Sequence, residues 1–337
     1  MREFLREILH ALEAGQPVEL VSVVRASGST PRGAGAMMAV FKDGHSAGTV
    51  GGGSAEFESQ KHAMALLERG GEDLCRFRFV QGEAASLGMV CGGDVEVQFQ
   101  YLSPEDGAAV EIIRELKEAC AHSADVWLVR RIEDGRVTAM GTAGREEVRH
   151  LAAPPAHLAD LLGNKAAFDG AWFAVPVVKA GRTYIFGGGH VSQALVPVLS
   201  AADFRPVVYD DRPEFADPAL FPGAERTICG SFLELSKHLT VTADDYVVIM
   251  TRGHQADYEV LTQVLRSGAK YLGCIGSRKK LALCRDRLLS DGFTEAEYAR
   301  LHAPIGLAIG AETPAEIAVA VAAEMIAVRA GVEKPKS

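Results

Sequence analysis

The stretch TYIFGGGHVSQALVPVLSAADFRPVVYDD, residues 183–211, decides the fold of the second half of the chain. A short apolar run meets three glycines, an amphipathic segment follows, and a second apolar run ends in Asp210. This is the order of strand, glycine turn, helix, strand and acid in a dinucleotide-binding βαβ unit. Gly187 and Gly189 would let the backbone approach a phosphate, whose charge a helix N-terminus favours. Asp210 follows Gly189 by 21 positions, about where a ribose-binding carboxylate is expected.

A glycine turn can also be purely structural and simply begin a helix. The residues after Asp211 therefore decide whether a Rossmann-like domain is predicted. Apolar runs at residues 246–250 and 271–275 alternate with helical patterns at residues 258–265 and 278–289. Such alternation predicts a parallel, doubly wound sheet. We therefore expect an α/β fold class, with a C-terminal Rossmann-like domain over residues 181–332.

The first half of the chain predicts a mixed α+β domain over residues 1–180. Residues 95–101 alternate between apolar and polar side chains, which indicates a half-exposed strand. Residues 151–170 show no period, and we interpret them as a connector. Three glycine-rich loops stand out, at residues 28–35, 51–53 and 92–93.

Composition excludes several classes of protein. The chain has 337 residues, 48% of them hydrophobic, which is enough for two domains with their own cores. A net charge of −9 argues against nucleic acid as a partner. No apolar run approaches the roughly 18 residues that a membrane span needs. Residues 1–13 are amphipathic rather than signal-like, so we expect a cytoplasmic protein.

The six cysteines form no CxxC pair and have no regular spacing. They fit a reducing cytosol better than a disulfide scaffold or a zinc site. Cys91 is the one to single out, because glycines flank it and would let a ligand approach its sulfur. A small buried core residue is an equally good interpretation of Cys91. The other five lie inside helix or strand patterns, which favours a packing role.

Two loops of the first half could hold an anion. Arg32 is the single cation of its small-residue loop and could grip a phosphate bidentately, although such an arginine is often merely solvated. Gly51, Gly52 and Gly53 place free backbone N–H groups at a predicted helix start. Glu56 lies in the first turn of that helix, where the helix dipole favours an acid.

The second half offers further candidates. Ser277 and Arg278 begin a basic helix that could bind an anion or could simply be solvated. His254 follows the strand at residues 246–250, on the side of a parallel sheet where ligands bind. His190 lies in the glycine turn itself. Either histidine could carry a proton or contact a ligand.

The motifs of hydrolases and kinases are absent from the sequence. There is no Ser–His–Asp set, no HExxH, no phosphate-loop GxxxxGK[ST] and no pair of carboxylates that the pattern brings together. We therefore expect any chemistry to be carried by something that the protein binds.

Taken together, these motifs resemble the xanthine dehydrogenase accessory protein family (XdhC/CoxI type). The resemblance covers nearly the whole chain, because its motifs occur in one order in both halves. They are Gly28-Ser29-Thr30-Pro31-Arg32, Gly51-Gly52-Gly53 with Glu56, Cys91-Gly92-Gly93, Phe186-Gly187-Gly188-Gly189-His190-Val191, Asp210-Asp211-Arg212, Gly276-Ser277-Arg278 and Thr313-Pro314-Ala315-Glu316-Ile317-Ala318.

The resemblance implies a chaperone for the molybdenum cofactor (molybdopterin). Such proteins bind the cofactor, support its sulfuration by a cysteine desulfurase and deliver it to a xanthine dehydrogenase-type molybdenum hydroxylase. In this interpretation Cys91 contacts the molybdenum end, while Arg32 and the loop at residues 51–53 hold the phosphate end. A carrier needs no general base, which agrees with the missing catalytic motifs.

A second interpretation comes from another class of protein. The glycine turn and Asp210 would equally suit an NAD(P)-dependent oxidoreductase, although this does not explain a cysteine and three glycine loops in a separate domain. The Rossmann-like domain could thus hold NAD or another nucleotide. Finally, the alanine-rich apolar helix predicted at residues 314–328 has little polar face, so it is either central to its domain or shared in a homodimer.

Overall fold

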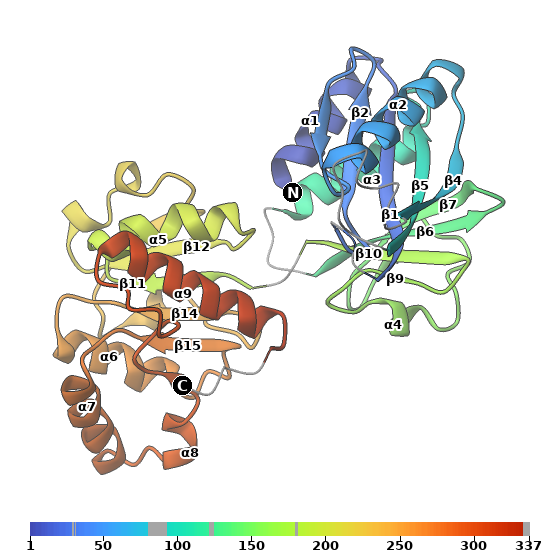
Figure 1. Cartoon of the computed structure of the whole chain (residues 1–337). Coiled ribbons are helices and arrows are strands. Elements are labelled where there is room, and N and C mark those ends of the chain that lie inside the picture. The colour runs from blue at the N-terminus through green and yellow to red at the C-terminus, as the bar shows by residue number, and fades with distance from the viewer. Residues whose placement is uncertain (29, 31, 80–92, 121–124, 179–180, 333–337) are drawn as a thin grey trace. The chain divides into compact units, whose positions relative to one another are not determined.

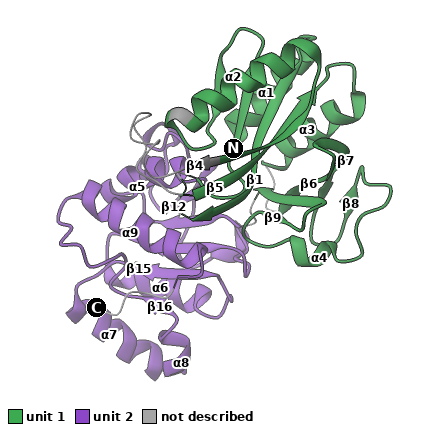
Figure 2. Cartoon of the chain, turned by 45° about the vertical axis from the view of Figure 1, so that its right-hand side comes forward, with its two compact units in different colours: residues 1–179 green, residues 180–337 purple. Residues whose placement is uncertain are grey.

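The computed structural model describes residues 1–28, 30, 32–79, 93–120, 125–178 and 181–332 (Figure 1). The chain forms two compact units, Met1–Lys179 and Ala180–Ser337 (Figure 2). The two units have separate hydrophobic cores.

The first unit is built on an antiparallel five-stranded sheet in the order β3-β2-β1-β5-β4. Gly44, with a φ of 85°, makes the tight turn between β2 and β3, where the Phe41 amide donates to the His45 carbonyl. The strand pairing agrees with the apolar and alternating runs of the sequence. The strands are β1 (Val18–Gly28), β2 (Met37–Phe41), β3 (Ser46–Gly48), β4 (Asp73–Phe79) and β5 (Gly93–Leu102).

Helices cover both faces of this sheet. Helix α2 (Gly53–Arg69) packs Ala63 and Leu66 against one face, and α1 (Arg2–Glu13) and α3 (Gly107–Ala119) pack on the other. Two local signals fix the ends of these helices. Asp106 caps α3 by accepting the amides of Ala108 and Ala109, each at 3.1 Å, and α2 ends at Gly70 in the left-handed conformation.

A second antiparallel sheet completes the first unit, in the order β8-β7-β6-β10-β9. The stretch 151–170, which we interpreted as a connector, contains the short helix α4 and the strand β9. That interpretation was therefore wrong in part, because elements of four and two residues are too short to show a period. The elements are β6 (Val126–Glu133), β7 (Arg136–Ala143), β8 (Val148–Arg149), α4 (Leu158–Leu161), β9 (Ala167–Phe168) and β10 (Trp172–Val178).

A buried arginine joins the two sheets of the first unit. The guanidinium of Arg130, on β6, donates to Ser22 Oγ at 2.8 Å and to Gln100 Oε1 at 3.1 Å, both on the first sheet. It also lies over the ring of Phe173, 5.1 Å from its centroid. Burial lowers the pKa of Arg130 from 12.5 to about 10, so the side chain stays charged at neutral pH.

Glu19, on β1, is a buried acid whose hydrogen bonding differs from that of Arg130. It is fully buried, and neither carboxylate oxygen accepts a hydrogen bond within the part of the chain that the structure describes. Burial, and then the negative charge of Glu72, raise the pKa of Glu19 from 4.5 to about 9. The carboxyl group is therefore protonated at neutral pH, since a buried charge without a partner costs several kcal/mol.

The second unit has a six-stranded parallel sheet in the order β13-β12-β11-β14-β15-β16 (Figure 1). This is the strand order 3-2-1-4-5-6 of a Rossmann fold, and it confirms the predicted fold class. The four central strands are completely buried because both faces are covered, whereas the edge strand β13 is exposed at its two ends. They are β11 (Thr183–Phe186), β12 (Pro206–Asp210), β13 (Arg226–Cys229), β14 (Tyr246–Ile249), β15 (Tyr271–Cys274) and β16 (Leu301–His302).

Two helix layers cover the faces of this sheet. On one face, α5 and α9 share a core that includes Leu195 and Val321, and α6 and α7 cover the other face with residues such as Leu261 and Leu288. The connections also contain α8 and three short 3₁₀ helices. The elements are α5 (His190–Ala201), η1 (Pro213–Phe215), η2 (Pro218–Leu220), η3 (Leu235–Lys237), α6 (His254–Val264), α7 (Arg278–Ser290), α8 (Glu295–Tyr298) and α9 (Pro314–Arg329).

Helix α9 is central to its own unit. Ala318, Val321 and Met325 are completely buried against the sheet and α5, whereas Val319 and Ile326 are exposed. The apolar character that suggested a dimer is thus largely explained by packing inside the unit. Among the described residues, no helix has the length and apolar character needed to cross a membrane.

Replacing Glu19 with Gln should stabilise the first unit increasingly as pH rises. Below about pH 4.5 Glu19 is protonated in the folded and unfolded chains; above it only the unfolded chain ionises, up to the folded-state pKa of about 9. Wild-type stability therefore falls with rising pH, at a limiting slope of about 1.4 kcal/mol per pH unit, and an amide removes that slope.

Urea unfolding followed by tryptophan fluorescence measures this effect, because the two tryptophans, Trp127 and Trp172, both lie in the first unit. The stability gap between Glu19→Gln and the wild type should widen from about pH 5.5 to about pH 8.5. A gap that does not change with pH would show that Glu19 is ionised in the folded protein.

Candidate functional site

The candidate site of the second unit lies at the carboxyl edge of its parallel sheet. Phe186 pairs with both Tyr209 and Ile249, and Ile249 pairs with Cys274, so the ends of four strands meet at this edge. The strand order reverses between β11 and β14, which is where ligands bind in open α/β sheets. The residues predicted after these strands are brought to one edge: Gly187, Gly189, His190, Asp210, His254, Ser277 and Arg278.

Three helices begin at this edge. Helix α5 has Gly189 as its N-cap and α6 has Gly253, and neither N-terminus receives a hydrogen bond from a capping side chain. Helix α7 differs, because the Ser277 hydroxyl accepts the Lys280 amide at 3.4 Å. Backbone N–H groups and the positive ends of the dipoles of α5 and α6 are therefore available to an anion.

The three glycines of the turn have different reasons to be glycine. A Cβ on Gly187 would lie 2.2 Å from the Met250 carbonyl oxygen, and one on Gly188 would lie 1.9 Å from that of Phe215. At Gly189 a Cβ would meet nothing within 4 Å. Packing inside the fold thus demands glycine at the first two positions, while Gly189 borders open space.

Asp210 stabilises this turn through hydrogen bonds. It is buried; Oδ2 accepts the Gly188 amide at 2.7 Å, and Oδ1 accepts Arg212 Nε at 2.9 Å. Burial opposes its ionisation, yet the hydrogen bonds from Arg212 and Gly188 lower the pKa of the Asp210 carboxyl below its usual value. The guanidinium of Arg212 in turn lies over Phe215, 3.7 Å from the ring centroid. Both carboxylate oxygens are therefore engaged, and a ribose contact by Asp210, which stays a prediction, would require Arg212 to move.

The other predicted residues at this edge are open to solvent. His190 and His254 are the first residues of α5 and α6, and both are exposed, as are Ser277 and Arg278. Their roles as ligand contacts stay predictions. The geometry does establish that they project from neighbouring strand ends, as the parallel topology requires.

Two acids at this edge escaped the sequence analysis. Asp257, on α6, accepts the Thr251 hydroxyl at 2.6 Å and the Thr251 amide at 3.1 Å, which fixes the loop between β14 and α6. Burial raises the pKa of its carboxyl despite these bonds. Glu324, on α9, is buried and holds the last loop. It accepts the Tyr271 hydroxyl at 2.7 Å and the Gly306 amide at 2.9 Å, and lies 3.1 Å from His302 Nδ1.

In the first unit, the predicted glycine loop is occupied by its own acid. The Glu56 carboxylate accepts the amides of Val50 at 3.2 Å and Gly52 at 3.1 Å, and also the Thr49 hydroxyl. Burial works against its ionisation, but these hydrogen bonds lower the pKa of Glu56. Gly52 and Gly53 both have positive φ, of 74° and 62°. Glu56 therefore closes the loop and takes the place that an external anion would need.

The remaining candidates of the first unit stay predictions. Arg32 is exposed on its loop. Cys91 and Gly92 lie outside the described residues, so the structure does not test the proposed thiol contact.

Comparison with known proteins gives the identity of the two units. A family model described as the XdhC Rossmann domain matches residues 183–325, and one described as the XdhC and CoxI family matches residues 11–78. The chain belongs to the XdhC and CoxI family. The match of the Rossmann model begins and ends inside the second unit, and the other model lies inside the first.

Relatives of this XdhC-family chain align along nearly its whole length. It is 27% identical over 329 residues to a probable xanthine dehydrogenase subunit of Bacillus subtilis, covering 94% of this chain and 95% of that protein. It is 22% identical over 328 residues to the molybdenum cofactor insertion chaperone PaoD of Escherichia coli, covering 97% and 88%. An uncharacterised E. coli protein, YqeB, is 26% identical over 318 residues, and the chain spans 44% of its length.

A solved structure supports the fold. A crystal structure described as a xanthine dehydrogenase from Bacillus halodurans matches with a TM-score of 0.80 at 24% identity, over 99% of this chain and 98% of that one. The fold of the XdhC-family chain is therefore shared with a solved protein.

The turn predicts that alanine destabilises the second unit more at Gly188 than at the neighbouring Gly189. Gly188→Ala should destabilise the second unit by about 1–3 kcal/mol, because the methyl group would overlap the Phe215 carbonyl. Gly189→Ala should cost about 1 kcal/mol or less, since its position is open and the change loses only the preference for glycine over alanine at an N-cap. Thermal unfolding of the two variants by circular dichroism compares them, and equal losses would contradict the difference in packing.

Proposed function

We propose that this chain is an accessory protein of a molybdenum hydroxylase. It takes the molybdenum cofactor as cargo, supports its sulfuration and inserts it into a xanthine dehydrogenase-type enzyme. Family membership supports this proposal, as do the names of two relatives, a molybdenum cofactor insertion chaperone and a probable xanthine dehydrogenase subunit.

The open space at Gly189 is the observation that carries the proposal. A glycine with no internal neighbour at its Cβ position, at the N-terminus of α5 and next to the uncapped N-terminus of α6, fits a phosphate or pyrophosphate group. A molybdopterin ends in such a phosphate. The Gly189 amide and the starts of α5 at His190 and α6 at His254 would hold it, since the Gly188 amide already donates to Asp210. The exposed Arg278 adds positive charge at the same edge, while Arg252 is paired with Asp211 at 3.0 Å.

The internal contacts favour this edge over the first glycine loop as the phosphate site. Glu56 already accepts the amides of Val50 and Gly52, so a phosphate at the loop of residues 51–53 would have to displace a carboxylate. At the turn of residues 187–189, Asp210 takes only the Gly188 amide, from the side of the sheet. We keep Arg32 and Cys91 as contacts for other parts of the cofactor, with the Cys91 thiolate at the molybdenum end.

The alternative function, an NAD(P)-dependent oxidoreductase, has one specific requirement. The ribose of a bound NAD(P) would need a free carboxylate at the end of β12. Asp210 at that position is paired with Arg212 and accepts the Gly188 amide. The accessory role makes no such demand. A cysteine desulfurase as partner, a homodimer and a cytoplasmic location belong to this proposal as well.

Purification from a host that makes the cofactor tests the role directly. The wild-type protein should carry molybdenum and show pterin fluorescence after oxidation. Gly189→Val should lose most of both while staying folded, because the branched side chain fills the space that the phosphate would occupy. Bound NAD(H) in place of a pterin would favour the oxidoreductase. If folded Gly189→Val carried as much pterin as the wild type, a phosphate site at Gly189 would be contradicted.

Cys91→Ala tests the thiol contact. The variant should lose molybdenum and fail to activate its hydroxylase while its melting temperature changes little, because only one metal contact is removed. Cys229→Ala is the matched control, since Cys229 is an exposed cysteine of the other unit. If Cys91→Ala retains cofactor and still activates the enzyme as well as the control does, the metal end is held elsewhere.

A further inference from the structure

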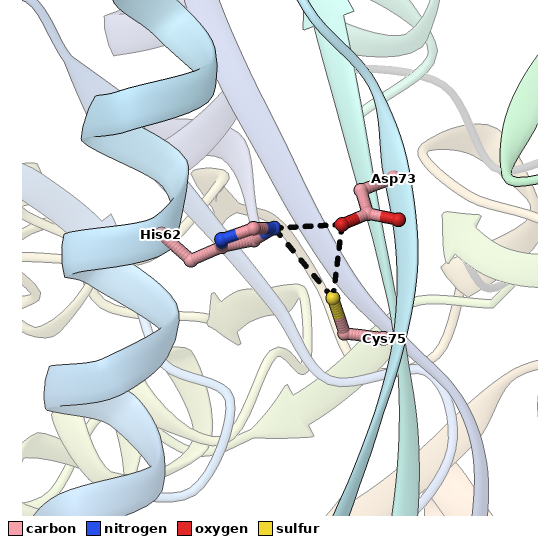
Figure 3. Close-up of side chains that lie close together, drawn as sticks. All are labelled: His62, Asp73 and Cys75. Carbon is pink, nitrogen blue, oxygen red and sulfur yellow. Dashed lines mark hydrogen bonds and ion pairs between the residues drawn. The ribbon is translucent and has the colours of Figure 1, made fainter.

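Three side chains that can bind a metal converge in the first unit, and none of them is a candidate site residue above (Figure 3). His62 projects from α2, and Asp73 and Cys75 project from the same face of β4, two residues apart. His62 Nε2 lies 2.9 Å from Asp73 Oδ2 and 3.5 Å from Cys75 Sγ, and that sulfur lies 3.1 Å from the same oxygen. A nitrogen, an oxygen and a sulfur thus point at one another from two elements.

These distances are close to those of a tetrahedral zinc site. Zinc bonds of about 2.0–2.3 Å put neighbouring ligand atoms roughly 3.3–3.6 Å apart. The sulfur–nitrogen distance of 3.5 Å already has this value. The two distances to the carboxylate oxygen are those of hydrogen bonds, so the oxygen would retreat by about half an ångström to admit an ion. A rotation of one partly exposed side chain can supply that movement.

Groups around the three ligands hold them in this arrangement. The Leu74 amide donates to Asp73 Oδ1 at 2.8 Å, which leaves Oδ2 facing the histidine and the thiol. The His62 ring packs edge-on against Phe99, with centroids 4.7 Å apart. Such outer contacts orient metal ligands in known sites. The His62 and Asp73 side chains remain 33% and 41% exposed, so an ion and a further ligand can reach them from solvent.

We propose that His62, Asp73 and Cys75 form a binding site for a divalent ion of the zinc type, with three protein ligands and an open fourth position. Imidazole, carboxylate and thiolate are together the donor set of a borderline-soft ion. Three ligands with access from solvent resemble zinc sites that keep a position for water or an added thiolate, rather than closed four-ligand structural sites. The ion would also tie α2 to β4, an edge strand that pairs only with β5 within the described sheet.

Binding is an exchange of a proton for the ion, with no change of oxidation state. In the present arrangement the Cys75 thiol donates its hydrogen to Asp73; burial, and then this bond, raise the pKa of Cys75 to about 12. On binding, the Sγ–H bond breaks, its proton passes to solvent, and Sγ bonds to the ion. His62 Nε2, which donates its hydrogen to Asp73 in the present arrangement, loses that hydrogen while Nδ1 gains one from solvent, so that the Nε2 lone pair can also bond to the ion. The positive ion replaces the proton between the sulfur and the carboxylate.

The same contacts argue against a cysteine nucleophile of the Cys–His–Asp type. In that arrangement the histidine bridges the two other groups through its two different nitrogens. Here Nε2 faces both Asp73 and Cys75, and the carboxylate contacts the thiol directly. A neighbouring carboxylate suppresses the thiolate form that a cysteine nucleophile needs.

Cobalt(II) titration of the whole chain, treated with a chelator and reduced beforehand, tests the site. We expect one ion per chain, with a thiolate-to-cobalt charge-transfer band and the visible bands of a tetrahedral ion, and about one proton released per ion. Zinc should displace the cobalt. Cys75→Ser and His62→Asn should each weaken binding by more than the roughly 10- to 100-fold that loss of a supporting outer group costs. Asp73→Asn keeps the shape of the side chain and should also weaken binding, which covers the case in which one variant fails to fold.

Cys284→Ser is the matched control, because Cys284 is another half-buried thiol whose pKa burial raises to about 11. It should bind cobalt as the wild type does and keep the thiolate band. The proposal is overturned if the wild type binds no more tightly than folded Cys75→Ser, or if the thiolate band survives in that variant. None of these residues belongs to the candidate cofactor edge. The pterin and molybdenum content of each variant should therefore be measured separately from its cobalt binding.

Discussion

The close approach of two backbone segments to the turn at residues 187–189 is the constraint on which the second unit depends. The carbonyls of Met250 and Phe215 leave no room for side chains at Gly187 and Gly188. Asp210 then fixes the turn through the Gly188 amide, while Arg212 balances its charge. Since this turn joins β11 to α5, the packing decides where the N-terminus of α5 faces. The open surface at Gly189 is a consequence of the crowding at its two neighbours.

Much of this fold could be predicted from the sequence, because buried parallel strands and amphipathic helices leave long periodic runs. Residues 183–211 formed β11, α5 and β12 as predicted, and the strand order confirmed the Rossmann fold. Helix α6 begins at His254, four residues before the helical pattern predicted at residues 258–265. Its first turn carries polar residues after a glycine N-cap, so its pattern resembles a loop.

The candidate site was predicted only in outline, since position along a strand can be inferred but the direction of a side chain depends on its tertiary neighbours. The strand ends brought Asp210 and His254 to one edge, yet nothing local indicated that Asp210 turns inward to Gly188. Glu324 left a usable signal, an acid inside an otherwise apolar helix. Asp73 and Cys75 are visible together as alternate residues of one strand, whereas their partner His62 is contributed by packing of a separate helix.

Helix α9 joins the last part of the second unit to its first. It covers the same apolar core as α5, and its Glu324 holds both Tyr271 of β15 and the backbone of Gly306. During synthesis, the glycine turn and α5 leave the ribosome more than a hundred residues before α9 does. Until then α5 lacks its neighbour and the loop after β16 lacks its anchor. A nascent chain therefore exposes the glycine turn and α5 well before α9 can pack beside α5.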